Sequence, residues 1–240
     1  MEKLTSKQLI YILPNLFTAS SIFVGVVSMI ASIHGEFEKA AWYILLALIF
    51  DGLDGRVARM TNTTSKFGVE FDSLADMVSF GMAPALLTYL YVGESFGKVG
   101  IVVSALFVIF GAIRLARFNV MTATIEPTVF IGVPIPTAAV FVSVIVLLFQ
   151  EYPFLESFKV VILFLTVFLG LLMVSNIRYP SFKKIQMAPQ HRMRILVGIL
   201  SLAFIAYLYP IESVALFFVI YIFYGPIRAL FTLSKLLKRR

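Results

Sequence analysis

The sequence predicts an all-α polytopic transmembrane helix bundle of about eight spans, with the N- and C-termini in the cytoplasm. Three observations support this fold class: 60% of the 240 residues are hydrophobic, the mean hydropathy is +0.96, and the basic residues fall in alternate loops. Such a composition is typical of membrane proteins. The chain has no cysteine and only two histidines, which excludes thiolate sites and histidine-rich metal sites.

Eight apolar stretches alternate with polar loops along the chain. Each is about 16 to 25 residues long, and a helix needs roughly 20 residues to cross the hydrocarbon core. The seventh stretch is short, and only Pro210 and Ile211 separate it from the eighth, so six spans with extra packing helices is the alternative. The stretches are 11–33, 40–58, 68–92, 99–118, 131–149, 155–175, 194–209 and 212–232.

The charges of the loops predict the orientation. With the N-terminus in the cytoplasm, the inner loops and ends carry 17 Lys and Arg residues, and the outer loops carry only Lys39, Lys98 and Lys159. This is a strong positive-inside asymmetry. It accounts for the net charge of +7 without a nucleic-acid partner, and it requires an even number of spans.

Five of the 13 acidic residues gather between positions 51 and 76. Asp51 and Asp54 lie three apart near the cytoplasmic end of the second span, and Asp72 and Asp76 lie four apart in the third. On a helix, each pair shares one face. Small residues on the same faces favour close approach of the two helices, which predicts that the four carboxylates converge. These small residues are Gly55, Ala58, Gly68 and Ala75.

Four carboxylates at membrane depth need protons, basic partners or cations, because each costs about 2.5–3.5 kcal/mol at the centre of a membrane helix. Oxygen ligands without His or Cys favour Mg²⁺ or Mn²⁺, and pairs of such ions recur in phosphoryl-transfer enzymes. Two alternatives stay open, namely ion pairs that only hold helices together and the proton or cation pathway of a transporter. The interiors of the other six spans contain no acidic residue, which argues against a pathway.

The spacing of the acidic stretch resembles the complete signature of the CDP-alcohol phosphotransferase family. In this sequence it reads Asp51-x₂-Asp54-Gly55-x₂-Ala58-Arg59-x₈-Gly68-x₃-Asp72-x₃-Asp76. Four further runs are similar to the phosphatidylserine-forming members of that family: SFGMAPA at 79–85, RLARFNV at 114–120, FIGVPIP at 130–136 and YPSFK at 179–183.

The resemblance implies a membrane enzyme, commonly a homodimer, and the loop charges predict that its active site lies on the cytoplasmic side of the cell membrane. It implies transfer of a phosphatidyl-type group from CDP-diacylglycerol or CDP-archaeol to L-serine, with release of CMP. It also implies a single domain over residues 1–240, with a catalytic core at about 10–185 and additional helices at about 190–235. Glycerol phosphate or inositol phosphate as the acceptor is the alternative with the same chemistry.

The resemblance also implies roles for individual residues. Two divalent cations, Mg²⁺ or Mn²⁺, would be bound by Asp51, Asp54, Asp72 and Asp76, and Asp76 would also be the general base. The CDP-linked lipid would be contacted by Asn15, Thr18, Gly55, Arg59 and Ser65. Capping roles are the alternative for Asn15 and Thr18 beside Pro14, and Ser65 also suits the N-cap of the third span.

An L-serine pocket needs charged and polar groups, because serine carries a carboxylate and an ammonium. Arg114, Arg117 and Asn119 lie near the cytoplasmic end of the fourth span and are the expected serine contacts. For the two arginines, anchoring at the cytoplasmic membrane face is the alternative. An acceptor that carries phosphate would need more basic residues around the site.

Overall fold

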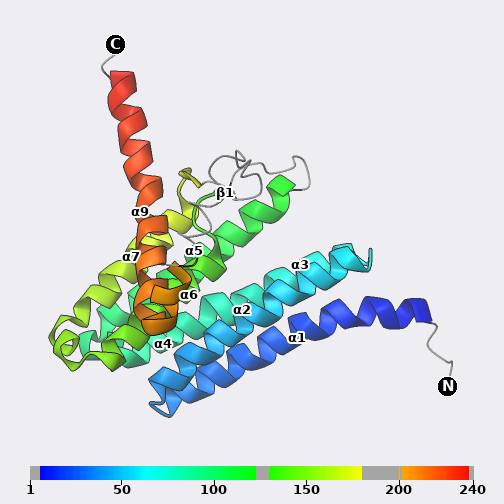
Figure 1. The fold of residues 1–240 in the computed structure, drawn as a ribbon, viewed down its shortest axis with the longest axis horizontal. Helices are drawn as coiled ribbons and strands as arrows, with labels where there is room; N and C mark the ends of the chain where they lie inside the picture. Colours follow the sequence, from blue (N-terminus) through cyan, green and yellow to red (C-terminus); the bar gives the residue numbers. More distant parts are fainter. Residues whose placement is uncertain (1–5, 123–129, 180–199, 201, 238–240) are drawn as a thin grey trace.

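A computed structural model of the chain describes residues 6–122, 130–179, 200 and 202–237. These residues are helical almost throughout, with one pair of two-residue strands (Figure 1). The elements are α1 (Ser6–Ile33), α2 (Phe37–Met60), α3 (Lys66–Asp76), the π-helical turn η1 (Met77–Met82), α4 (Ala83–Tyr91), the 3₁₀ turn η2 (Gly93–Phe96), α5 (Lys98–Thr122), β1 (Phe130–Ile131), α6 (Ile135–Glu151), the 3₁₀ turn η3 (Pro153–Phe158), α7 (Val160–Val174), β2 (Arg178–Tyr179) and α9 (Pro210–Leu237).

The lengths and composition of these helices fit a helical membrane protein. Within the described residues, four segments are long and apolar enough to cross a membrane: Ile12–Ile33, Lys66–Tyr91, Lys98–Met121 and Pro210–Ala229. Helices α6 and α7 are apolar but shorter. The total of eight spans and the cytoplasmic termini stay predictions, and residues 194–199 and 201 of the seventh predicted span lie outside the described residues.

Helix α1 packs against both helices that carry the acidic stretch. It packs along α2 and also contacts α3, η1 and α4, and the three helices α1 to α3 run side by side in Figure 1. Hydroxyl groups of α1 reach the backbone of α2: Ser28 Oγ donates to Ala40 O at 2.8 Å. Small polar side chains of this kind allow close helix packing within a membrane.

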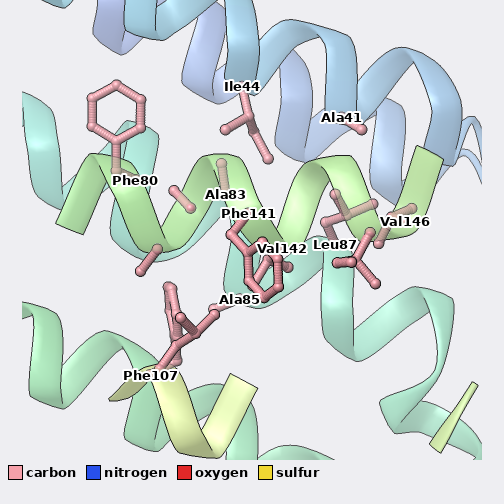
Figure 2. Close-up of a cluster of buried hydrophobic side chains, with 14 of the residues drawn as sticks. Ala41, Ile44, Phe80, Ala83, Ala85, Leu87, Phe107, Phe141, Val142 and Val146 are labelled. Carbon is pink, nitrogen blue, oxygen red and sulfur yellow. The ribbon is translucent and has the colours of Figure 1, made fainter. Parts of the chain in front are cut away.

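The hydrophobic core lies around α6, which is buried along most of its length. Figure 2 shows side chains from α2, η1, α4, α5 and α6 gathered into one cluster. Ile44, Phe80, Phe107 and Phe141 are each at most 1% exposed there. Because α2, α4, α7 and α9 all pack on α6, this helix fixes the positions of the elements around it.

The π-helical turn η1 follows directly after Asp76 and joins α3 to α4. Within it, Ser79 is fully buried and donates to Ser21 O of α1 at 2.9 Å. Gly25 makes this approach possible, because a Cβ there would lie 2.9 Å from the Cα of Ser79. π-helical turns are rare and are often found at functional sites, and here packing against α1 holds the turn in place.

The strand pair connects the core to the last helix. β1 and β2 are antiparallel, with Phe130 opposite Tyr179 and Ile131 opposite Arg178. The hydroxyl of the buried Tyr179 donates to Ile222 O in α9 at 3.1 Å. Its ring lies against Gly225, where a Cβ would come within 2.4 Å of the ring. Tyr179 therefore attaches α9 to the end of α7.

Candidate active site

Three of the four predicted aspartates form a compact cluster. Asp51, Asp72 and Asp76 each offer a carboxylate oxygen, and these oxygens lie within 4.8 Å of one another. Asp76 is only 8% exposed, and its Oδ1 has no hydrogen-bond partner among the described residues. Close carboxylates repel each other, and a buried unpaired one costs free energy. A hard divalent cation would relieve both costs, so these side chains fit a metal site.

Asp54 lies beside this cluster rather than within it. Its Oδ2 accepts a hydrogen bond from Thr18 Oγ1 at 2.6 Å, and both side chains are buried. Of the four carboxylates that the sequence predicted to converge, three are therefore grouped tightly and Asp54 is held by α1.

The predicted close approach of the second and third spans holds only in part, because Asp51 meets Asp72 and Asp76 while the small residues of α2 and α3 do not meet. The two helices make few direct contacts with each other, and α1 packs against both. For a Cβ at Gly55, the three nearest atoms would all belong to Arg59, one turn later in α2, and a Cβ at Gly68 would meet Ser65 and Asn15. The small residues therefore leave space between the helices instead of closing it.

That space is a cavity of about 190 Å³. All five predicted contacts of the CDP-linked lipid line it, namely Asn15, Thr18, Gly55, Arg59 and Ser65. Asp54 and Asp72 also line it, and because Asp72 belongs to the aspartate cluster as well, the cavity and the cluster are continuous. Two further lining residues, Thr63 and Thr64, were not predicted, and the polar run that joins α2 to α3 was the available signal.

The start of α3 contributes the positive end of a helix to the cavity wall. Ser65 is the N-cap of α3, as the sequence suggested, and its Oγ accepts a hydrogen bond from Gly68 N at 3.0 Å. Helix N-termini attract anions through their unpaired N–H groups and the helix dipole, and Arg59, which also lines the cavity, adds a full positive charge. This arrangement suits a diphosphate.

Arg114 is a buried cation near the cluster. It is 7% exposed, its guanidinium carbon lies 5.4 Å from the centre of the Phe118 ring, and it interacts electrostatically with Asp76. The described residues provide it with no hydrogen bond or ion pair. Buried guanidinium groups usually have anionic or carbonyl partners, so Arg114 is suited to bind an anion that enters the site.

Arg117 and Asn119 already have partners in the fold. The Arg117 guanidinium donates to Val174 O at 3.0 Å and to Met173 O at 3.1 Å, with longer bonds to Ser175 O and Ile131 O. Arg117 therefore caps the C-terminus of α7 from another helix. Asn119 Nδ2 donates to Ser73 Oγ of α3 at 3.0 Å. Their predicted role in binding serine stays a prediction.

Comparisons with known proteins agree with this geometry. The model of the CDP-alcohol phosphatidyltransferase family matches residues 11–172. The chain is 52% identical over 229 residues to a CDP-diacylglycerol–serine O-phosphatidyltransferase of Helicobacter pylori (strain J99), and the match covers 95% of both chains. It is 39% identical over 170 residues to an archaetidylserine synthase of Methanothermobacter thermautotrophicus, covering 70% of this chain and 69% of that one. A CDP-diacylglycerol–serine O-phosphatidyltransferase of Bacillus subtilis is 33% identical over 172 residues, covering 72% and 92%.

Proposed function

The chain belongs to the CDP-alcohol phosphatidyltransferase family, and from this premise we propose that it transfers a phosphatidyl-type group from a CDP-linked lipid to the hydroxyl of L-serine. The products are a phosphatidylserine-type lipid and CMP. The observation that carries this function is the continuity of the cavity with the aspartate cluster through Asp72. Relatives named for the serine reaction, similar over most of the chain, support serine as the acceptor.

The cavity would hold the CDP group. Ser65 and the first turn of α3 face the diphosphate with the positive end of a helix, and Arg59 offers a planar fork for phosphate oxygens. Gly55 leaves room for the nucleotide beside the α2 backbone, where a Cβ would lie 3.4 Å from the Arg59 guanidinium. The diphosphate would then lie next to Asp72 and the rest of the cluster.

The four aspartates would hold divalent cations, which we propose to be two ions of Mg²⁺ or Mn²⁺. When bound, such ions polarise the phosphoryl oxygens and offset the charge on departing CMP. Asp51, Asp72 and Asp76 would supply ligands from the cluster, and Asp54 would supply one from the cavity side. The family is metal-dependent, and the choice of oxygen ligands supports these two ions over zinc.

Asp76 would act as the general base. A serine hydroxyl is a weak nucleophile, so a carboxylate must accept its proton as the new oxygen–phosphorus bond forms. The bond between that phosphorus and the oxygen of CMP breaks, and CMP leaves with the electron pair. The support for Asp76 is its burial and the unpaired Oδ1, which leaves one oxygen able to take the proton.

The enzyme is proposed to be a homodimer in the cell membrane with its active site facing the cytoplasm. The excess of Lys and Arg in alternate loops supports a multi-pass protein of a single domain, with the aspartates near the cytoplasmic face. The homodimer is supported by the family resemblance.

Release of CMP tests the acceptor. Purified protein in detergent micelles is incubated with CDP-diacylglycerol and Mn²⁺, and L-serine, glycerol 3-phosphate or inositol phosphate is supplied in turn. We expect CMP to be released with L-serine only. Release with a phosphorylated acceptor instead would move the function to another reaction of the family, and addition of EDTA should stop release in either case.

Arg114 is our candidate for binding the serine carboxylate, since it is a buried cation near Asp76 to which the described residues provide no hydrogen bond or ion pair. Arg114→Gln should raise KM for L-serine about 10- to 100-fold, because a hydrogen bond to a charged group contributes roughly 1.5–3 kcal/mol. The KM for CDP-diacylglycerol should change little. Steady-state kinetics with each substrate varied separately measure both values.

A matched control is Arg56→Gln, which neutralises an exposed arginine of α2 that does not line the cavity. It should leave KM for L-serine near the wild-type value. If Arg114→Gln lowered kcat and left KM for L-serine unchanged, the guanidinium would not be the carboxylate contact.

A further inference from the structure

The contact between Thr18 and Asp54 joins α1 to the proposed metal site. Thr18 Oγ1 lies 2.6 Å from Asp54 Oδ2 and 3.2 Å from Pro14 O. A hydroxyl has one proton and can donate it to only one of these acceptors at a time. The carboxylate is closer and charged, and charge-assisted hydrogen bonds are shorter and stronger than neutral ones. The proton of Thr18 therefore belongs with Asp54.

The hydrogen bond between Thr18 and Asp54 is buried, which strengthens its hold on the carboxylate. Thr18 is 3% exposed and Asp54 is 6% exposed, so little water competes for the hydrogen bond on any side except that of the cavity. Asp54 also lies outside the compact group formed by the other three aspartates, and beside a backbone contact at Gly55 the Thr18 hydroxyl is the side-chain group that orients it. We infer that Thr18 is a positioning residue, which donates to Asp54 Oδ2 and thereby fixes the rotation of that carboxylate for binding a divalent cation.

This role differs from a direct contact with the CDP group. A hydroxyl whose proton is donated to Asp54 can offer a ligand in the cavity only its lone pairs. The inference rests on the proposed metal site but does not depend on serine as the acceptor. It predicts that loss of the hydroxyl weakens cation binding even when neither substrate is present.

The test is a titration of the purified full-length protein with Mn²⁺, without substrates, in which the electron paramagnetic resonance signal reports free Mn²⁺. Thr18→Val keeps the shape of the side chain and removes the hydroxyl. It should raise the Kd for Mn²⁺ about tenfold, the lower end of the loss typical when a residue that orients a metal ligand is changed. Thr18→Ser keeps the hydroxyl and should stay near the wild-type Kd.

Ser20→Ala is the matched control on the same helix, because the Ser20 hydroxyl donates to Leu16 O and does not reach the site. Its Kd should equal that of the wild type. Thr18→Ala, measured in parallel, should show the same increase as Thr18→Val and serves if the valine variant does not fold.

Two outcomes would overturn different parts of the interpretation. If both hydroxyl-lacking variants bound Mn²⁺ like the wild type but bound CMP more weakly, Thr18 would be a nucleotide contact and the inference would be wrong. If the wild-type protein itself bound no Mn²⁺, the proposed metal site would fail first.

Discussion

Replacement of Asp76 by Asn should lower serine-dependent CMP release by roughly 10²- to 10⁴-fold, the range typical for loss of a general base. Asparagine has almost the same shape as aspartate but cannot accept the proton of the serine hydroxyl. The fold should persist, because the amide can donate to the neighbouring carboxylates of Asp51 and Asp72, which share the cluster. The initial rate of CMP release measures the effect, and thermal unfolding followed by circular dichroism checks the fold.

The role of Asp76 as base can be separated from its role as metal ligand. If Asp76 is the base, saturating Mn²⁺ should not restore the rate of Asp76→Asn. Full recovery at high Mn²⁺ would limit Asp76 to cation binding, and near-normal turnover without added metal would remove it from both roles. Glu70→Gln is the control, because Glu70 is an exposed acid of the same helix that belongs to neither the cluster nor the cavity wall.

Replacement of Arg117 by Ala should destabilise the fold by on the order of 3 kcal/mol, because several carbonyl groups at the end of α7 lose a charged donor. Arg117→Lys should recover only part of this loss, since an ammonium group cannot span carbonyls as widely as the planar guanidinium does. The midpoint of thermal unfolding in detergent measures the change. Arg56→Ala, which removes an exposed cation of α2, should shift the midpoint little.

The opposite pattern would give Arg117 a different role. If Arg117→Ala unfolded at the wild-type temperature and raised KM for L-serine, the side chain would bind the acceptor, as the sequence alone suggested. The position of Gly132 makes this outcome unexpected. Its φ is +74°, and a Cβ there would lie 2.4 Å from Met173 O and 3.1 Å from the Arg117 guanidinium, so this junction is packed closely around the side chain.

The sequence predicted the parts of the site that depend on local spacing. Asp72 and Asp76 are one helical turn apart, so any helix places them on one face, and Ser65 caps α3 because its hydroxyl needs only a backbone N–H three residues ahead. The family resemblance then predicted which residues would contact the CDP group, and all five of these predicted residues line one cavity.

Contacts between residues distant in sequence could not be predicted from spacing. Thr18 and Asp54 are 36 positions apart, and Arg117 and Val174 are 57 apart, so these pairs exist only once the helices have packed. The same limit explains why the small residues of α2 and α3 do not meet as expected. Gly and Ala allow close approach of helices but do not require it, and the packing of α1 against both helices decided the outcome.

The π-helical turn after Asp76 lets one helical segment place aspartates in the site and apolar side chains in the core. A regular α-helix would keep the face of the aspartates in line with the next turns of the segment, whose side chains belong to the apolar core. The extra residue in the turn changes the rotational phase, so that Phe80 and Ala83 lie in the apolar core while Asp72 and Asp76 belong to the aspartate cluster. Substitutions in the core-facing residues of η1 and α4 can therefore change the packing of this segment without turning the aspartates of α3, although the two parts form one continuous helical segment.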